Sequence, residues 1–328
     1  YENINYMIDY VFYSTSKTEY QNWQRDLLEY TFIKVNQSGK LIAYCSENEH
    51  NAIPKTIHHT IIENEVDCPD YMNHFHKNKK YGIANKFFSI KLWLENNPEL
   101  TGTVLFLDPD MIFNDKIDIV VKKGTIIGQL WTDSNIENHK NFKKYTPDSL
   151  KHLLIPQNIF MFPFCINIED LRTIINDFVE LSSMIYLNEG SWESDMYAIV
   201  IAALKHNLKI EGANFGCCNN WHNFNNQDFK MVYYPGKIFD KDKNQIFFKQ
   251  DFTKNTYTIP WKLSITPYQT TNKVEYQLIN ALQEYVNLQQ IKEKYPDMLY
   301  WNNNKIKNNY TPTNKYIFCK PWKGGFNN

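Results

Sequence analysis

The most informative stretch of the sequence is VLFLDPDMIF, residues 104–113. Apolar residues lead into two aspartates, Asp108 and Asp110, with Pro109 between them. A short, continuously apolar run is typical of a central strand that is buried on both faces of a parallel sheet. In open α/β sheets, ligands bind outside the carboxyl ends of the strands, which is where these aspartates stand. The stretch therefore predicts an α/β protein with a ligand site at the two carboxylates.

Two carboxylates this close repel each other unless a cation or a proton lies between them. Pro109 stiffens the turn that joins them, because its ring fixes the backbone angle φ. Hard divalent cations such as Mn²⁺ or Mg²⁺ take oxygen ligands and often leave positions open for substrate phosphates. The pair of aspartates therefore suits a metal that clamps a diphosphate. The alternative interpretation is a solvated turn after a buried strand.

Strand and helix patterns alternate along the chain around this stretch. From β-branched and aromatic runs we expect strands at residues 8–13, 40–44, 103–108, 125–130 and 229–234. Apolar spacing predicts helices at residues 20–35, 85–97, from 168 behind an Asn167 cap, from 194, and at 273–294. Phe88 and Leu92 mark the expected apolar side of the second helix. The order favours a mostly parallel, Rossmann-like sheet with flanking helices.

Composition limits the class of protein. The 328 residues are 43% hydrophobic, which is enough for a sizeable core, and the formal net charge of -1 gives no global attraction to nucleic acid or acidic membranes. No apolar run is long enough for a membrane span. The six cysteines lack zinc-site spacing and indicate mostly free thiols in a reducing compartment. We expect a soluble, cytoplasmic protein, or a protein of the secretory lumen if a leader precedes Tyr1.

Four segments, in this order, resemble the hydroxyproline O-arabinosyltransferases and the peptidyl-serine α-galactosyltransferases of plants and algae. They are Tyr20-x-x-Trp23-Gln24, Asn85-Lys86 ahead of Trp93-Leu94, LDPDM at 107–111, and W-x-x-D-M-Y-A at 192–198. The resemblance covers residues 8–245, and phage or giant-virus relatives of these enzymes are the expected nearer match.

What the resemblance implies is a GT-A glycosyltransferase: a Rossmann-like enzyme that takes a nucleotide-sugar donor, usually UDP-linked, and retains anomeric configuration. It implies Mn²⁺ (or Mg²⁺) with Asp110 as the main ligand, and Asp108 on the metal or on the ribose. Such a metal neutralises charge that develops on the departing diphosphate. We expect residues 1–250 to form the nucleotide-sugar-binding and catalytic domain. Residues 251–328 are then a C-terminal helical extension packed on the same domain.

Further donor-binding positions follow from the same resemblance. Ser14, Thr15 and Ser16, after the first strand, would lie beside the nucleotide, although they also suit a plain polar turn. Lys86 matches the family's Asn-Lys pair and would meet a phosphate as a point charge, unless it belongs to a solvated helix face.

Asp195 stands where relatives usually carry Glu, and Trp192 and Tyr197 flank it. As a catalytic residue, Asp195 would face the sugar or the acceptor hydroxyl, with Trp192 beside it. It would stabilise an oxocarbenium-like centre or act as a nucleophile. In the other retaining mechanism, front-face attack, the leaving phosphate takes the acceptor proton. The structural alternative is that Asp195 merely favours a helix N-terminus.

One position departs from the family pattern. Relatives tend to carry a histidine late in the domain that completes the metal site, and Tyr233 stands at the matching place here. Tyrosine is a poor ligand at neutral pH because its pKa is near 10. His222 is a nearby substitute. Otherwise the metal would rest on the two aspartates, water and the diphosphate.

Three functions stay open from the sequence. The first is transfer of a sugar from a UDP-sugar to a hydroxyl acceptor, hydroxyproline or serine of a protein or, less expected, a glycan. The second is a phage enzyme that glycosylates a hydroxymethylated DNA base, which only the basic clusters at residues 76–80 and 237–249 favour. The third is a non-catalytic carbohydrate-binding protein on the same fold, motivated by Tyr233. Neither the sugar nor the oligomeric state follows from the sequence.

Overall fold

The computed structural model describes residues 8–16, 18–46, 65–71, 81–130, 142–155, 160–213, 215–216, 229–234, 237–239, 245–249 and 273–294. The chain divides into two compact units, residues 1–287 and 288–328. The expected domain boundary after residue 250 stays a prediction. Within the described ranges, no helix has the length and apolar character that crossing a membrane requires.

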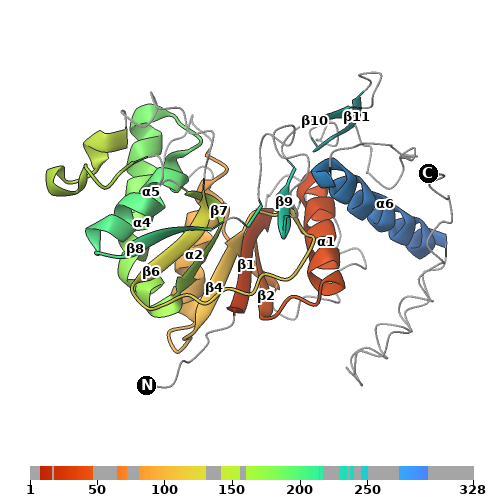
Figure 1. The fold of residues 1–328 in the computed structure, drawn as a ribbon, viewed down its shortest axis with the longest axis horizontal. Coiled ribbons are helices and arrows are strands. Elements are labelled where there is room, and N and C mark those ends of the chain that lie inside the picture. Colours follow the sequence, from red (N-terminus) through yellow and green to blue (C-terminus); the bar gives the residue numbers. More distant parts are fainter. Residues whose placement is uncertain are drawn as a thin grey trace. The chain divides into compact units, whose positions relative to one another are not determined.

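The helices are α1 (Glu19–Lys34), α2 (Ala84–Asn96), α4 (Ile168–Glu189), α5 (Ser194–Lys205) and α6 (Lys273–Lys294), with short 3₁₀ turns at Lys143–Tyr145 and Asp148–Leu150. The strands are β1 (Ile8–Ser16), β2 (Lys40–Ser46), β3 (Glu65–Cys68), β4 (Thr103–Leu107), β5 (Met111–Phe113), β6 (Thr125–Leu130), β7 (Phe160–Asn167), β8 (Lys209–Ala213), β9 (Met231–Tyr233), β10 (Lys237–Phe239) and β11 (Gln245–Phe248). Figure 1 shows their arrangement.

Seven strands form the central sheet, in the order β3-β2-β1-β4-β7-β6-β8. Neighbours pair in parallel from β3 to β4 and between β6 and β8. Only β7 runs against its neighbours, β4 and β6. Six of the seven strands therefore point the same way. The protein is an α/β fold with a mostly parallel sheet flanked by helices, as predicted.

The helices α1 and α2 lie on opposite faces of this sheet. Consecutive side chains of a strand point to opposite faces. On β1, the ring of Phe12 packs 5.2 Å from that of Trp93 in α2, whereas the hydroxyl of the next residue, Tyr13, donates to Glu29 in α1. The α2 face also carries α4, which packs against α2 (Figure 1).

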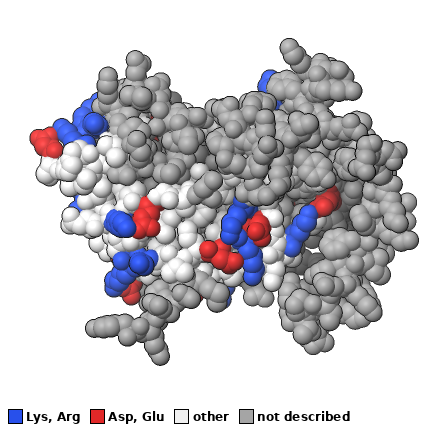
Figure 2. Space-filling model, in the orientation of Figure 1, with Lys and Arg blue, Asp and Glu red and all other residues white. Residues whose placement is uncertain are grey.

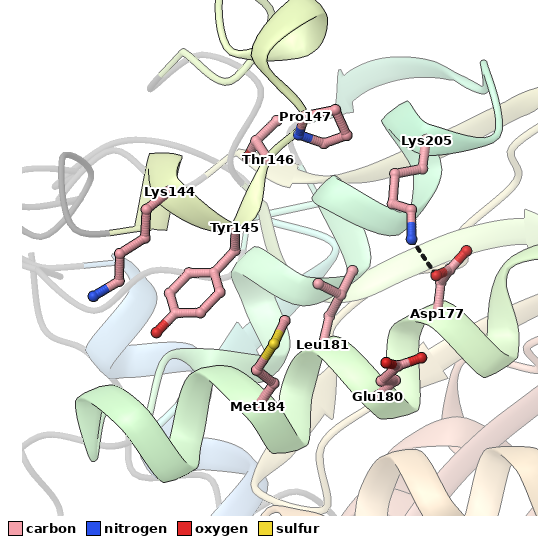
Figure 3. A pocket seen from close by; sticks show the side chains of 9 residues that line it. All are labelled: Lys144, Tyr145, Thr146, Pro147, Asp177, Glu180, Leu181, Met184 and Lys205. Atoms are coloured by element: carbon pink, nitrogen blue, oxygen red, sulfur yellow. Dashed lines mark hydrogen bonds and ion pairs between the residues drawn. The ribbon is translucent and has the colours of Figure 1, made fainter.

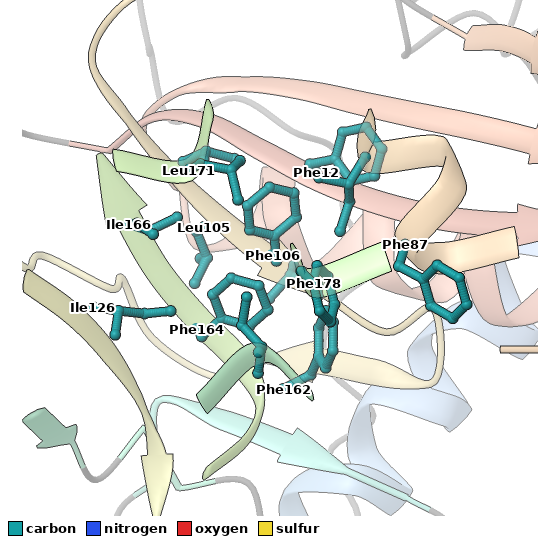
Figure 4. Packing of buried hydrophobic residues seen from close by; sticks show 14 of the residues in the cluster. Phe12, Phe87, Leu105, Phe106, Ile126, Phe162, Phe164, Ile166, Leu171 and Phe178 are labelled. Carbon is teal, nitrogen blue, oxygen red and sulfur yellow. The ribbon is translucent and has the colours of Figure 1, made fainter. Parts of the chain in front are cut away.

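Aromatic side chains fill the core under the carboxyl end of β4. All five residues of β4 are buried, as expected for a central strand. Phe106 lies between Phe12 and Phe164, with ring centroids 5.4 and 4.9 Å apart (Figure 4). A second apolar cluster joins α1, β5, β9, β11 and the first part of α6 through Trp23, Tyr234 and Leu282. The aspartates that follow β4 thus stand on a densely packed base.

The elements predicted from local pattern are present, but the expected apolar side of α2 is wrong. Phe87, Ile90 and Leu94 are among its buried residues, whereas Phe88 and Leu92 are half-buried. Strand β7 was not predicted; it contains Pro163, and proline is rare in a central strand. Here the neighbouring strand β6 shifts register between Gly128 and Gln129, close to that proline.

Candidate functional site

The site begins where three parallel strands end together. Tyr13 pairs with Leu107, the last residue of β4, so Asp108 follows that strand at the level of Ser14 in β1. Behind this edge, the buried side chain of Asn85 accepts a hydrogen bond from the Tyr71 N–H at 2.6 Å. The same amide donates to Ser46 and Asp70, each at 3.1 Å. These bonds fasten the start of α2 to the strand ends and so direct Lys86 toward them.

Lys86 joins two carboxylates that come from different elements. Its Nζ lies 2.7 Å from Asp108 Oδ1, after β4, and 3.2 Å from Asp195 Oδ2, in the first turn of α5. It also lies 3.8 Å from the ring centroid of Phe162 on β7, a cation–π contact. The Asp195 side chain is fully buried, and its Oδ1 has no hydrogen-bond partner among the described residues. This oxygen is therefore a buried hydrogen-bond acceptor that Lys86 does not satisfy.

Asp110 has a lysine of its own. Lys249, directly after β11, places its ammonium against Asp110 Oδ2, and both residues are buried, 9% and 7% exposed. The same ammonium lies 5.1 Å from the ring centroid of Tyr233. Nothing in the sequence marks Lys249, because it stands in a lysine-rich segment that resembles a solvated surface. The structure adds it to the site.

Strand β9 brings the tyrosines beside Asp110. Met111 pairs with Tyr233, and the Tyr234 N–H donates to the Asp110 carbonyl at 3.2 Å. Tyr233 thus lies beside the segment that carries Asp110, and its correspondence to a metal-binding histidine stays a prediction. Burial, with Asp110 second, raises the pKa of Tyr234 well above its usual value, so this phenol stays neutral. Tyr20, from the first of the four segments, is close enough to interact electrostatically with Lys249 and Asp110.

Burial affects the pKa values of the charged groups in the site. Burial lowers the pKa of Lys86, but Asp108 and Asp195 more than reverse this, so its pKa lies above the ordinary lysine value. Burial raises the pKa of Asp195, and Lys86 only partly opposes it. Burial likewise raises the pKa of Asp110 against the opposing effect of Lys249. Both ammonium groups therefore stay charged. Neither lysine fully offsets the effect of burial on the pKa of Asp195 or of Asp110.

The other predicted residues lie in different surroundings. The Ser14 hydroxyl donates to the Asn85 carbonyl at 3.2 Å, and Thr15 Oγ1 and the Ser16 N–H both donate to Gln21 Oε1 at 2.9 Å. The two bonds to Gln21 close the turn between β1 and α1, whereas the Ser14 bond reaches α2. A donor-binding role for the three residues stays a prediction. Trp192 is 53% exposed in the turn before α5. Tyr197 is buried and stacks on Phe142, with centroids 3.8 Å apart, so it belongs to the core. His222 lies outside the described residues.

The donor set suits a metal that arrives with a phosphate ligand. No group of three or more His, Cys, Asp or Glu side chains in the described ranges could hold a metal ion. Asp108 and Asp110 supply two carboxylates, each with one oxygen on an ammonium. Mg²⁺ is commonly held by one or two carboxylates together with water and substrate phosphates. The residues present fit that mode of binding.

A separate hollow of about 330 Å³ lies between the 3₁₀ segment and the helices α4 and α5 (Figure 3). Both of its lysines are already paired: Lys205 with Asp177, and Lys144 with Glu189. Lys205 ends α5, ten residues from Asp195, which corresponds to about 15 Å of helix. None of the residues that line the hollow belongs to the carboxylate–lysine site.

No protein-family model matches the chain, and no curated protein matches it by sequence. Among the similar solved structures is the apo form of the bifunctional glycosyltransferase WbbM, at 14% identity and a TM-score of 0.44. That match covers 80% of this chain and 51% of the other, so the chain spans about half the length of that protein. A likeness this distant assigns no activity.

Proposed function

We propose that this chain is a glycosyltransferase that moves a sugar from a UDP-sugar to a hydroxyl group, with hydroxyproline or serine of a protein as acceptor. The observation that carries the proposal is the contact of one ammonium, that of Lys86, with both Asp108 and Asp195. Lys86 and Asp195 are 109 residues apart. The three residues come from three of the four segments on which the resemblance to glycosyltransferases rests.

A buried charge cluster of this kind supports a ligand site rather than a purely structural role. Taking charges out of water is expensive, and well-packed apolar residues are often as stable as a buried ion pair. Ionisable groups with strongly perturbed pKa values therefore gather at functional sites more than elsewhere. Two ammonium groups and three carboxylates leave the cluster with one net negative charge. An anionic donor therefore calls for an additional cation.

Each residue then has a role that its surroundings support. Asp108 and Asp110 would hold Mn²⁺ or Mg²⁺ together with the donor diphosphate, and such a metal supplies Lewis-acid stabilisation of the leaving group when bound. Lys86, a point charge beside Asp108, is suited to a phosphate oxygen of the donor. Oδ1 of Asp195, which has no hydrogen-bond partner among the described residues, would accept a hydrogen bond from the sugar or face its anomeric carbon. Double displacement and front-face attack both remain compatible with this position.

Trp192 is suited to the acceptor side. It precedes Asp195 by three residues and keeps half of its surface exposed. An exposed aromatic ring offers a flat apolar surface for a sugar or for a proline-like ring, with edges that still bind water. We propose that the ring of Trp192 contacts the acceptor.

DNA as the acceptor has less support. Two basic clusters favoured it. The first, residues 76–80, lies outside the described ranges. In the second, Lys249 forms an ion pair with Asp110. Figure 2 shows lysines and acidic residues side by side on the described part of one face, rather than an area of one sign. Phosphate contacts with DNA would need a continuous basic surface.

The test is release of nucleotide from a panel of UDP-sugars, with Mn²⁺ and with EDTA, followed by addition of hydroxyproline and serine peptides. We expect metal-dependent release from one sugar, and loss of release in Asp108→Ala and Asp110→Ala variants that remain folded by circular dichroism. Unchanged turnover in both variants would contradict the site. Donor binding without any release, with and without peptides, would favour the carbohydrate-binding alternative.

A further inference from the structure

We propose that Lys249 is a built-in counter-ion: its ammonium holds Asp110 until a divalent metal arrives with the donor diphosphate, and then passes to that diphosphate. This inference rests on the proposed function and assigns a role to a residue outside all four segments of the resemblance. Three observations carry it: where the ammonium lies, how buried the pair is, and how the charges of the site balance.

The ammonium lies on the ligand that the metal needs. Its contact is with Oδ2 of Asp110, the aspartate with the largest expected share in metal binding. Only about a tenth of either side chain is exposed, so few water molecules can separate the two charges. A metal ion that binds this oxygen must displace the ammonium. Lys249 and the metal are therefore competitors for the same atom.

The charge balance favours an exchange in which the diphosphate takes part. With both lysines in place the cluster carries one negative charge, so the metal gains attraction from it but must break a buried ion pair. A displaced ammonium that stayed buried without a partner would be costly. The diphosphate of the donor brings two negative charges beside the metal. It supplies the partner that the displaced ammonium needs.

The side chain of lysine suits this transfer. It carries a compact charge with three rotatable donors on a flexible four-carbon stem, so it can turn from a carboxylate to a nearby phosphate. The ring of Tyr233, 5.1 Å away, is a neutral surface that favours a cation without binding it tightly. The ammonium can therefore leave Asp110 without losing all favourable contacts.

The consequence is strong coupling between metal and nucleotide. When the metal binds alone, breaking the Lys249–Asp110 ion pair reduces its binding free energy. When it binds together with the diphosphate, the new contact of Lys249 with phosphate offsets that loss. By linkage, UDP must raise the affinity for Mn²⁺ by the same factor by which Mn²⁺ raises the affinity for UDP. In the wild-type protein we expect this factor to be large, on the order of a hundredfold.

The experiment is Mn²⁺ binding to the full chain, measured by electron paramagnetic resonance with and without UDP, and UDP binding measured by calorimetry. The variant is Lys249→Met, which keeps the stem and removes the charge. We expect Mn²⁺ without UDP to bind about tenfold more tightly to this variant than to wild type, because the competitor is gone. We expect UDP with saturating Mn²⁺ to bind about tenfold more weakly, because one phosphate partner is gone.

Lys237→Met is the matched control. Lys237 belongs to the same hairpin, since it pairs with Phe248, but its side chain is exposed and its ammonium lies over the Phe248 ring. This control removes the same charge, and we expect wild-type affinities for both ligands. Lys249→Arg keeps the positive charge, and we expect its Mn²⁺ affinity without UDP to stay low. It also serves if Lys249→Met does not fold.

The opposite signs of the two effects separate the proposal from a structural role, which would weaken both ligands together. The proposal is overturned if Lys249→Met binds Mn²⁺ as weakly as wild type or more weakly. If Lys249→Met does not fold, the proposal is overturned by a Mn²⁺ affinity of Lys249→Arg that is higher than that of wild type. Failure of the wild-type protein to bind UDP with Mn²⁺ overturns the proposed function and the transfer to diphosphate. The Mn²⁺ measurement without UDP still decides whether Lys249 competes with the metal, so the two failures are distinguishable.

Discussion

Replacement of Lys86 by methionine tests the central contact of the site through stability alone. The substitution keeps most of the side-chain volume and removes the one ammonium between Asp108 and Asp195. Breaking a buried ion pair by removal of one partner costs about 3–5 kcal/mol, because the other charge stays buried. The Lys86 side chain is 15% exposed, so we expect the lower end, about 3 kcal/mol. This is a large part of the roughly 5–15 kcal/mol that stabilises a typical domain.

The same helix offers a control of the same residue type. Lys91 pairs with Glu95 one turn further on, at 3.8 Å, and the two side chains are 34% and 59% exposed. Exposed pairs of this kind contribute about 0–0.5 kcal/mol, so Lys91→Met should leave the free energy of unfolding nearly unchanged. The measurement is urea unfolding followed by circular dichroism and by tryptophan fluorescence.

A second substitution locates the cause of the loss. Asp195→Asn, introduced together with Lys86→Met, removes one of the two carboxylates that the ammonium had compensated. We expect the double variant to regain about 1–2 kcal/mol relative to Lys86→Met alone. If Lys86→Met lies within about 0.5 kcal/mol of the Lys91→Met control, the reasoning about a buried charge cluster is refuted. Purely additive effects of the two substitutions would refute the contact between Lys86 and Asp195.

Three further expectations concern the fold around the site. Phe87→Ala should cost about 3–5 kcal/mol of stability, and Phe88→Ala clearly less, since only Phe87 is fully buried; equal losses in urea unfolding would contradict the orientation of α2. Asn167→Ala should cost about 1 kcal/mol, because its side chain caps α4 by accepting from the Glu169 N–H at 2.9 Å; an unchanged melting temperature would contradict this cap. Burial raises the pKa of Asp177, but the two basic side chains that it contacts at the end of α5 lower it by more. Its contribution to stability is therefore complete above the ordinary aspartate pKa and is lost as pH falls through the lowered value, so Asp177→Asn should flatten the acid side of a stability–pH curve.

Much of the fold follows from local pattern. The bounds of α6 and β6 agree with the sequence prediction, and the strand that directly precedes Asp108 is the buried centre of the sheet. Apolar periodicity, caps and the short run before the aspartates depend on neighbours within a few residues, so they are legible in a single sequence. The apolar side of α2 could not be predicted from the sequence, because Phe87 and Phe88 are adjacent and equally apolar. Only the position of the sheet decides which of them is buried.

The same distinction between sequence and tertiary structure holds for the candidate site. Sequence alone predicted Lys86, Asp108, Asp110 and Asp195 as site residues, through their order and their resemblance to known segments. Tertiary structure decided that one ammonium serves two of these carboxylates, and that Asp110 is held by a lysine 139 residues away in a segment with no distinguishing pattern. The physical reason is that an ion pair needs proximity and burial, and the folded chain supplies both between residues whose local sequences carry no record of each other.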